Sequence, residues 1–333
     1  MKKAFILLLA FILIFTGCSK SDVKEDTGKV EYRIGVSKML AHPALDAVEK
    51  GMKDHLDKSG LRITYDFQNA QGEISSCASI AQKFKDDGCD VVLGIATPTA
   101  QSLVNIFYDT PVVFSAVTDP VDAGLVETYD PDPDSNVCGV SDMNPVEEQI
   151  KLLMDVTGAK VIGNIYASGE ANGVILMEQA KAAVEKLGGT FVEVSVANSA
   201  EVKMAAQSII DRVDAIYIAT DNTVISALAA FDDVCNKNGK ALFSADPTAT
   251  EGLEALIAWG FDYYALGLKT GEAIESIIKG ASAGQLGTIF LTDPKDFDLR
   301  INLDTAKKLG LDISDDVKAK AAIIIENGEI IEK

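Results

Sequence analysis

Short runs rich in β-branched and aromatic residues alternate with longer amphipathic stretches from residue 31 to residue 291. This alternation is typical of β-α-β units, in which a helix connects two parallel strands of one sheet. Strands are expected at 32–37, 62–67, 90–96, 112–117, 137–140, 160–167, 190–196, 215–219, 241–244, 256–260 and 288–291. Helices are expected at 43–58, 74–87, 98–108, 146–156, 173–187, 200–212, 222–239 and 264–279. The sequence therefore predicts an α/β fold built on parallel sheets.

The chain of 333 residues is too long for one small core, and its β-α units fall into two sets. About four units come first, and a comparable set runs from residue 161 to residue 246. We therefore expect two similar α/β lobes joined by several crossings that form a multi-strand hinge. Lobe 1 is expected to comprise residues 30–143 and 252–283, and lobe 2 residues 144–251 and 284–330.

The N-terminal segment has the pattern of an export signal. Two lysines precede an apolar run, 4–15, that is too short to span a hydrocarbon core roughly 30 Å thick as a helix. Small residues followed by Cys18 resemble the lipobox of bacterial lipoproteins, whose cysteine receives a diacylglycerol, although Phe15 stands where that motif has an aliphatic residue. We expect a signal peptide at 1–17 and a lipidated cysteine with a polar tether at 18–29, which would anchor the protein on the extracytoplasmic face of the cell membrane. An ordinary secretory signal with an incidental cysteine is the alternative.

The formal net charge of −20 at pH 7 argues against several classes of partner. Nucleic-acid phosphates would repel so acidic a surface, and so would an anionic bilayer. Beyond the signal, Cys77, Cys89, Cys138 and Cys235 form no C-x-x-C pair and have no histidine at metal-ligand spacing. We therefore expect buried, unpaired thiols, no metal site and no nucleic-acid partner.

The sequence lacks the common catalytic motifs. His42 and His55 are its only histidines, and it has no G-x-S-x-G nucleophile elbow, P-loop or H-E-x-x-H motif. The glycine triplet of a dinucleotide fingerprint is missing after the first strand, and the Asp- and Pro-rich loop 129–135 lacks the Glu and Gly of an EF-hand. A serine or cysteine paired with His42 is the enzymatic alternative. We expect no enzyme, no catalytic residue and no cofactor.

Small polar residues follow nearly every expected strand in both lobes. In open α/β sheets a ligand lies beyond the carboxyl ends of the strands, so these residues are the candidate ligand site. Helix N-caps occupy the same positions, and capping is the alternative for each residue taken singly. The candidate ligand-binding residues are Ser37, His42, Thr97, Thr99, Thr118, Asp119, Asp142, Glu170, Asn172, Asp221, Asn222 and Asp246.

The residues around Pro98 indicate what such a site would bind. Pro98 suits the first helical position, so Thr97 is the expected N-cap, and the N–H groups of Thr99 and the next residue are expected to be unpaired. Such a helix start favours a carboxylate, with simple capping as the alternative. On the other lobe, Asp221 is expected to receive an ammonium group, with Glu170 or Asp246 as the alternatives, unless Asp221 only caps the helix that follows it. An anion cradle facing acids is the pattern of a receptor for a zwitterion.

Sequence blocks occur in the same order along both lobes. The first lobe carries I-G-V-S-K and H-P-A-L-D-A within 34–47, Q-N-A-Q-G at 68–72, A-T-P-T-A-Q at 96–101 and V-V-F-S-A-V-T-D-P-V-D-A-G-L-V at 112–126. Further blocks are G-E-A-N at 169–172, D-A-I-Y-I-A-T-D-N-T-V at 214–224, S-A-D-P at 244–247 and G-F-D-Y-Y-A-L-G at 260–267. Together they resemble the tryptophan/tyrosine-type solute-binding lipoproteins of bacterial ABC importers. The resemblance covers residues 31–283, and the long 292–299 segment departs from it.

This resemblance implies a periplasmic-binding-protein-like fold with two Rossmann-like lobes and hinged closure. It implies a receptor without catalytic activity that binds a small solute outside the membrane and delivers it to an ABC permease driven by a cytoplasmic ATPase. We expect such a receptor to be a monomer. Carried over block by block, Ser37, His42, Thr97, Thr99, Thr118 and Asp119 would line one wall of the cleft. Asp142, Glu170, Asn172, Asp221, Asn222 and Asp246 would line the hinge and the other wall.

The resemblance also implies an aromatic or other apolar amino acid as the ligand. Phe67, Phe114, Tyr166 and Tyr263 are the candidates to stack on a ring, with core packing as the alternative. A ligand-sensing lipoprotein that regulates a membrane receptor would use the same cleft and is the second hypothesis. The effector domain of a repressor would need a helix-turn-helix, which the N-terminus does not offer.

Overall fold

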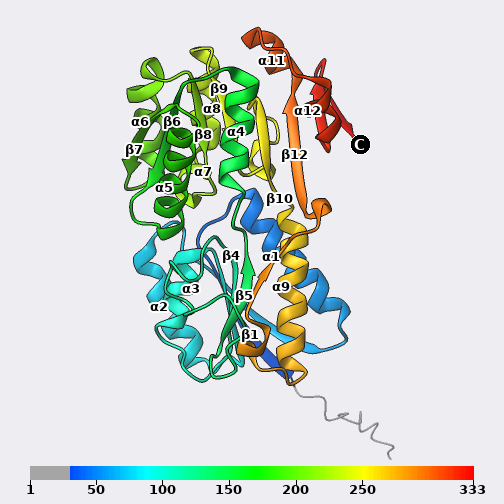
Figure 1. The fold of residues 1–333 in the computed structure, drawn as a ribbon. Helices are drawn as coiled ribbons and strands as arrows, with labels where there is room; N and C mark the ends of the chain where they lie inside the picture. Colours follow the sequence, from blue (N-terminus) through cyan, green and yellow to red (C-terminus); the bar gives the residue numbers. More distant parts are fainter. Residues whose placement is uncertain (1–30) are drawn as a thin grey trace, which may run out of the picture. The chain divides into compact units, whose positions relative to one another are not determined.

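The computed structural model describes residues 31–333, which form two lobes, and the first lobe is built on a sheet of six strands. These strands are β1 (Glu31–Lys38), β2 (Arg62–Asn69), β3 (Val91–Ile95), β4 (Val112–Val117), β5 (Val137–Ser141) and β11 (Thr288–Phe290). They lie in the order β11-β5-β4-β3-β1-β2, and every pair is parallel. The helices α1 (Pro43–Lys58) and α9 (Tyr263–Ile278) lie on one side of this sheet, and α2 (Ile74–Asp86) and α3 (Thr97–Val104) on the other (Figure 1). The short α10 (Ala283–Leu286) contacts β5.

The second lobe is built on a sheet of eight strands. They are β6 (Val161–Ala167), β7 (Thr190–Val196), β8 (Ala215–Ile218), β9 (Ala241–Ser244), β10 (Ile257–Phe261), β12 (Phe297–Asn302), β13 (Ile323–Glu326) and β14 (Glu329–Glu332). Their order is β14-β13-β12-β10-β9-β8-β6-β7, and the pairs are parallel except β10–β12 and β13–β14. The helices are α4 (Val146–Thr157), α5 (Ala171–Lys186), α6 (Val202–Ile209), α7 (Asn222–Ile225), α8 (Leu228–Lys237), α11 (Leu303–Leu309) and α12 (Asp315–Lys320). The predicted α/β fold with two largely parallel lobes is confirmed.

Burial explains why these segments form strands in the interior. Every residue of β3, β4 and β5 is buried, as expected for continuous apolar runs covered by helices on both faces. The edge strand β2 instead has exposed or half-exposed residues throughout, with an alternating polar pattern. The predicted burial of the four thiols is also confirmed, because Cys77, Cys89, Cys138 and Cys235 are buried and unpaired.

The chain crosses from one lobe to the other three times. Two of these crossings lie at other residues than the predicted lobe boundaries. The first, 142–145, follows β5, as expected. The predicted ranges place β10 in lobe 1, but it pairs with β9 in the second sheet, so the second crossing lies at Asp262, just before α9. The strand β11 was assigned to lobe 2, but it pairs with β5 in the first sheet, and the third crossing is 291–296. Both errors arise because sequence order alone does not state which of the two sheets a late strand joins.

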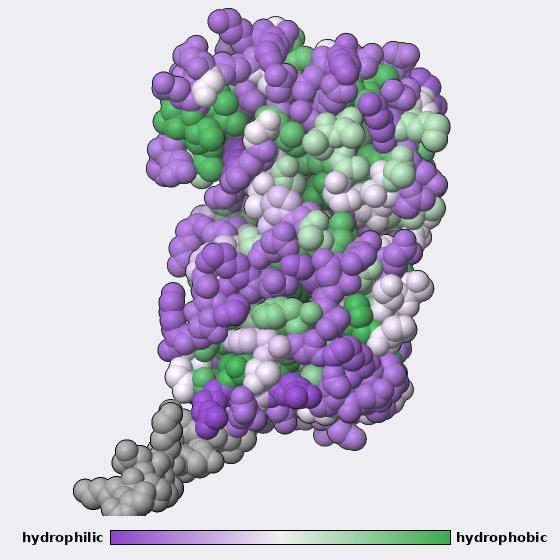
Figure 2. All heavy atoms as spheres, turned by 180° about the vertical axis from the view of Figure 1, so that it is seen from behind, coloured by the Kyte–Doolittle hydropathy of each residue, from purple (hydrophilic) through white to green (hydrophobic). Residues whose placement is uncertain are grey.

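Several helix boundaries also differ from those predicted. The expected helix 222–239 is two helices, α7 and α8, and the expected helix 98–108 ends at Val104. The segment beyond 291, for which no elements were predicted, supplies β12, β13 and β14 together with α11 and α12. No helix within residues 31–333 is long and apolar enough to cross a membrane. The face seen in Figure 2 is mostly hydrophilic, as the acidic composition leads one to expect.

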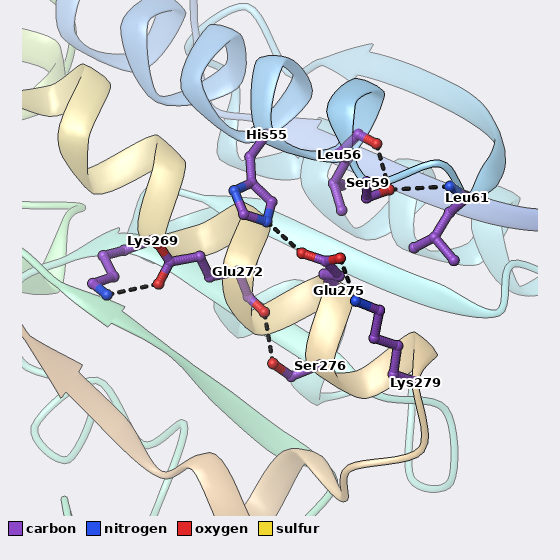
Figure 3. A network of polar contacts seen from close by, with 9 residues as sticks. All are labelled: His55, Leu56, Ser59, Leu61, Lys269, Glu272, Glu275, Ser276 and Lys279. Carbon is purple, nitrogen blue, oxygen red and sulfur yellow. Dashed lines mark hydrogen bonds and ion pairs between the residues drawn. The ribbon is translucent and has the colours of Figure 1, made fainter.

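The helices α1 and α9 approach each other closely because glycines line their contact. A Cβ atom added at Gly267 would lie 2.3 Å from the carbonyl oxygen of Val48, and one at Gly51 would lie 2.3 Å from that of Tyr264. Next to this contact, the ring Nε2 of His55 lies 2.6 Å from Glu275 Oε2, and Glu275 Oε1 accepts from Lys279, also at 2.6 Å (Figure 3). His55 thus links two helices of lobe 1.

Candidate functional site

A cavity lies between the two lobes at the carboxyl ends of their strands, where the sequence predicts the ligand site. It is lined from the first lobe by His42, Leu45, Ala116, Asp142 and Tyr263, and from the second by Asn172, Thr220, Asp221, Asn222, Ile225 and Asp246. We call this cavity the cleft. Its volume is about 10 Å³, room for about one water molecule. The two walls therefore lie almost in contact.

The topology brings these residues together. Asp142 follows β5, Asp246 follows β9, and Asp221 follows β8 and begins α7. His42 lies in the turn between β1 and α1, and Asn172 in the first turn of α5. Strands of both sheets run toward the cleft, so the residues just after them meet there.

Buried polar atoms without a hydrogen-bond partner gather at this edge of both sheets. They include the Ser37 and Thr97 hydroxyls of the first lobe and the Thr220 hydroxyl and Asn172 carbonyl oxygen of the second. Both ring nitrogens of His42 also lack a partner, although Asn222 of the other lobe lies beside the ring. Unpaired buried polar groups cost free energy, so a cluster of them requires a reason, and a polar ligand would provide one.

The His42 ring is uncharged at neutral pH. Burial lowers its pKa to about 4, and the Lys38 charge acts in the same direction. The Lys38 ammonium group is engaged elsewhere, since it pairs with Asp46 at 2.5 Å and with Glu49 at 2.9 Å. His42 is therefore a neutral donor and acceptor on the wall of the cleft.

Asp142 stands where the chain leaves the first lobe. Its Oδ2 accepts from the Tyr263 hydroxyl at 3.0 Å and its Oδ1 from the Thr118 hydroxyl at 3.3 Å. Tyr263 begins α9 directly after the second crossing, so this contact joins two crossings of the hinge. Burial raises the pKa of Asp142 to about 6, and the two hydroxyl donors oppose that shift.

Asp221 and Glu170 are neighbouring buried acids, and their contacts are mainly structural. Asp221 Oδ2 accepts from Ala167 N–H at 2.6 Å, and Oδ1 accepts from Val224 N–H at 3.0 Å, which caps α7. Glu170 accepts from the Asn222 side chain at 2.5 Å and from both the N–H and hydroxyl of Thr223, at 3.0 and 2.6 Å. Burial, followed by the Glu170 charge, raises the pKa of Asp221. The capping alternative thus holds for Asp221, although its side chain still lines the cleft.

The start of α3 differs from its prediction. Thr97 is the first helical residue, and the cap is Ala96, a non-glycine residue at φ 81°. The N–H of Ala100 already donates to the Ala96 carbonyl, and the Thr99 hydroxyl donates to the carbonyls of Ile95 and Ala96. The Thr99 side chain therefore serves the backbone, and Thr97 is the residue of this turn with an unpartnered hydroxyl.

Half of the predicted residues line the cleft: His42, Asp142, Asn172, Asp221, Asn222 and Asp246. The other six, Ser37, Thr97, Thr99, Thr118, Asp119 and Glu170, lie outside its lining. Asp119 organises a turn instead, because it accepts from Val121 N–H and from the Tyr129 hydroxyl.

Several lining residues were not in the predicted set. Thr220 lies two residues beyond the end of β8, and the sequence proposes Tyr263 only as a ring that stacks on the ligand. Leu45, Ala116 and Ile225 are apolar, and nothing in their sequence positions separates them from core residues. Ala116 is marked by its backbone conformation and not by its sequence position. It adopts φ 52° at an irregularity in the pairing of β4 with β5. Phe114 is a core residue, and Phe67 is partly exposed and stacks on Tyr65.

Comparison with known proteins identifies the family. The model of the ABC transporter substrate-binding protein family matches residues 33–325. The chain belongs to this family. The family is one of solute-binding proteins and not of enzymes.

Similar proteins come from Clostridioides difficile and Streptococcus pneumoniae. The tyrosine-binding protein of Clostridioides difficile (strain R20291) is 34% identical over 325 residues, which is 93% of each chain. A domain from Streptococcus pneumoniae, solved in complex with L-Trp, is 32% identical with a TM-score of 0.84, over 89% of this chain and 100% of that one. The ligand-free, open structure of a substrate-binding protein with adhesive properties from Clostridium difficile is 34% identical with a TM-score of 0.64, over 85% of this chain and 96% of that one.

Proposed function

We propose that this ABC transporter substrate-binding protein is an extracytoplasmic lipoprotein that captures an aromatic amino acid in the cleft and delivers it to an ABC permease. The observation that carries the proposal is that buried polar atoms without a partner line both walls of the cleft, in His42 of the first lobe and in Asn172 and Thr220 of the second. The related proteins that bind tyrosine or were solved with L-Trp support this ligand class.

The carboxylate of the ligand would lie against the first lobe. The hydroxyls of Ser37 and Thr97 lie outside the lining of the narrow cleft, but they are buried without partners at the ends of the neighbouring strands β1 and β3. Each would gain a hydrogen bond to a charged group, worth roughly 1.5–3 kcal/mol. The ammonium group would face the carboxylates of Asp142, Asp221 and Asp246.

Opening of the lobes would admit the ligand. The relative solved with L-Trp and the open, ligand-free relative are almost equally identical to this chain, at 32% and 34%, yet their TM-scores are 0.84 and 0.64. Sequence divergence does not account for that gap, and the difference supports the proposal that one lobe rotates against the other. Small-angle scattering should show a smaller radius of gyration with ligand than without, and an unchanged radius at saturating ligand would argue against hinged closure.

The substitution Thr97→Val tests the site. Because the Thr97 hydroxyl has no partner, its removal should leave the free energy of unfolding unchanged or slightly higher, yet weaken the binding of L-Tyr or L-Trp about tenfold, measured by calorimetry. Thr270→Val is the matched control, because that buried hydroxyl contacts Ser115 at 2.6 Å and donates to Leu266. It should lower stability and leave affinity unchanged. Equal affinity of Thr97→Val and wild type would remove Thr97 from the site.

Lipid anchoring is a separate proposal. Cys18 lies outside the described residues, and the support for its lipidation is the sequence pattern alone. We expect Cys18→Ser to release the protein from the membrane or to leave it unprocessed, measured by fractionation of cells. A variant that is processed and partitions into membranes like wild type would contradict lipidation at this residue.

A further inference from the structure

The cleft holds an excess of buried acids. Asp142, Asp221 and Asp246 line it, Glu170 lies beside Asp221, and each of the four is at most 3% exposed. No lysine or arginine is among the lining residues, and the histidine there is neutral. Buried carboxylates without a cation favour their protonated forms. A ligand that brings its own cation changes this balance.

The hydrogen bonds of the four acids differ, and the difference singles out Asp246. Both oxygens of Asp221 accept backbone N–H groups, Glu170 accepts three hydrogen bonds, and Asp142 accepts a hydroxyl on each oxygen. Asp246 Oδ1 accepts from Ala249 N–H at 3.0 Å, and the N–H of Thr248 also stabilises the charged form of this carboxylate. A carboxylate has about four acceptor sites, and no side chain within residues 31–333 donates to Asp246, so it retains capacity for a further donor.

The charged groups around Asp246 do not neutralise it. Asp142 and Tyr263 face it from the hinge, and His42 and Asp221 line the same cleft. Arg300 of β12 is the cation on this side, and its guanidinium group is shared with Glu251 at 3.5 Å and Asp298 at 3.8 Å. Burial raises the pKa of Asp246 to about 7, with the Asp142 charge acting in the same direction and Arg300 opposing it.

We propose that Asp246 receives the ammonium group of the ligand and that this contact expels a proton, so that binding in the cleft is coupled to proton release. The inference rests on the proposed function, since it needs a ligand with an ammonium group. The protonated carboxyl group of Asp246 gives up its proton to bulk water as the ammonium arrives, and a carboxylate–ammonium pair remains. Atoms and charge balance, and no further reactant is needed. Affinity therefore falls at acidic pH, where the proton competes with the ligand.

Calorimetry in two buffers counts the protons. L-Tyr or L-Trp is titrated into the protein in phosphate and in imidazole buffer, whose ionisation enthalpies differ, and the difference in binding heat gives the number of protons exchanged. With a pKa of about 7 for Asp246, release should be about 0.8 proton per ligand at pH 6.5 and close to zero at pH 8.5. The dissociation constant should rise about tenfold for each pH unit below 6. Equal heats in both buffers at pH 6.5, with binding present, would overturn the inference and leave the proposed function standing.

Variants and analogues assign the proton. Asp246→Asn should bind at least tenfold more weakly, with no release. Asp232→Asn is the matched control, because Asp232 is a buried acid of the same lobe whose pKa is also raised by burial, yet it contacts Asn236 and Glu254 and lies outside the cleft lining. It should release protons as wild type does. Indole-3-propionate, which lacks the ammonium group, provides a second test with the wild-type protein. Its binding should release no proton. Release that persists in Asp246→Asn would overturn the assignment, whereas the absence of binding by every amino acid would overturn the proposed function itself.

Discussion

Gln149→Met removes the centre of a buried network beneath the hinge. Gln149 lies in α4 and is 0% exposed. Its side-chain nitrogen donates to Asn144 Oδ1 at 3.1 Å and to the Trp259 carbonyl at 2.6 Å, and its oxygen accepts from the Tyr217 hydroxyl at 2.7 Å. These partners lie in the first crossing, in β10 and in β8. The network therefore ties the chain that enters the second lobe to that lobe's sheet.

The expected loss follows from the three hydrogen bonds. Methionine has nearly the same shape as glutamine, so packing is largely kept while the hydrogen bonds go. At about 1 kcal/mol net for each bond, Gln149→Met should lower the free energy of unfolding by about 3 kcal/mol. The orphaned Tyr217 hydroxyl and Asn144 oxygen would push the loss higher, because each stays buried. Gln82→Met makes the same change on the exposed face of α2 and should stay within about 0.5 kcal/mol of wild type.

Urea unfolding of residues 31–333 measures these losses, and a double-mutant cycle tests their cause. Tyr217→Phe removes the hydroxyl that Gln149→Met would orphan. The double variant should therefore be less destabilised than the sum of the two single variants, by about 1 kcal/mol. A loss below 1 kcal/mol for Gln149→Met, or strict additivity in the cycle, would show that this network does not hold the crossing.

Three further substitutions or conditions give direct tests. Gly267→Ala should lower stability by about 1–3 kcal/mol in thermal unfolding instead of gaining the usual helix propensity, because its Cβ would strike the Val48 carbonyl; a gain would contradict the close helix contact. Asp262→Ala should cost about 1 kcal/mol in urea unfolding, since Asp262 caps α9 through two N–H groups, and no loss would deny the cap. Between about pH 5 and pH 7, the stability of the ligand-free protein should fall as pH rises. The reason is that burial raises the pKa values of Asp142 and Asp246, so the folded protein keeps protons that the unfolded chain has released. Urea unfolding at a series of pH values measures this, and a free energy of unfolding that rises from pH 5 to pH 7 would contradict the burial of these two acids.

The alternation of strands and helices could be predicted because burial imposes it. The strands β3, β4 and β5 are fully buried, largely apolar runs, and such runs are typical of a parallel sheet covered by helices on both faces. The same reasoning failed to place β10 and β11, since an apolar strand fits either sheet: β10 lies between β9 and β12 inside the second sheet, and β11 lies at the edge of the first. The tail strands β12 to β14 are amphipathic or partly exposed, and their pattern is correspondingly weak.

The candidate site could be predicted as a place, but the role of each residue could not. Polar residues at strand ends mark the cleft, which is how His42 and Asp246 were found. Whether an acid binds a ligand or caps a helix depends on which N–H groups its oxygens meet, as Asp221 shows. The Thr99 hydroxyl likewise donates to the backbone instead of facing a ligand. The sequence predicted that the helix starts at Pro98, whereas it starts one residue earlier, at Thr97.

Native mass spectrometry of residues 31–333 against the set of common amino acids tests the central claim most directly. The account predicts one bound molecule of L-Tyr or L-Trp per chain, with that complex lost or much reduced in Asp246→Asn and retained in Asp232→Asn. A protein that binds no amino acid, or one whose bound fraction is indifferent to substitution in the cleft, would contradict it.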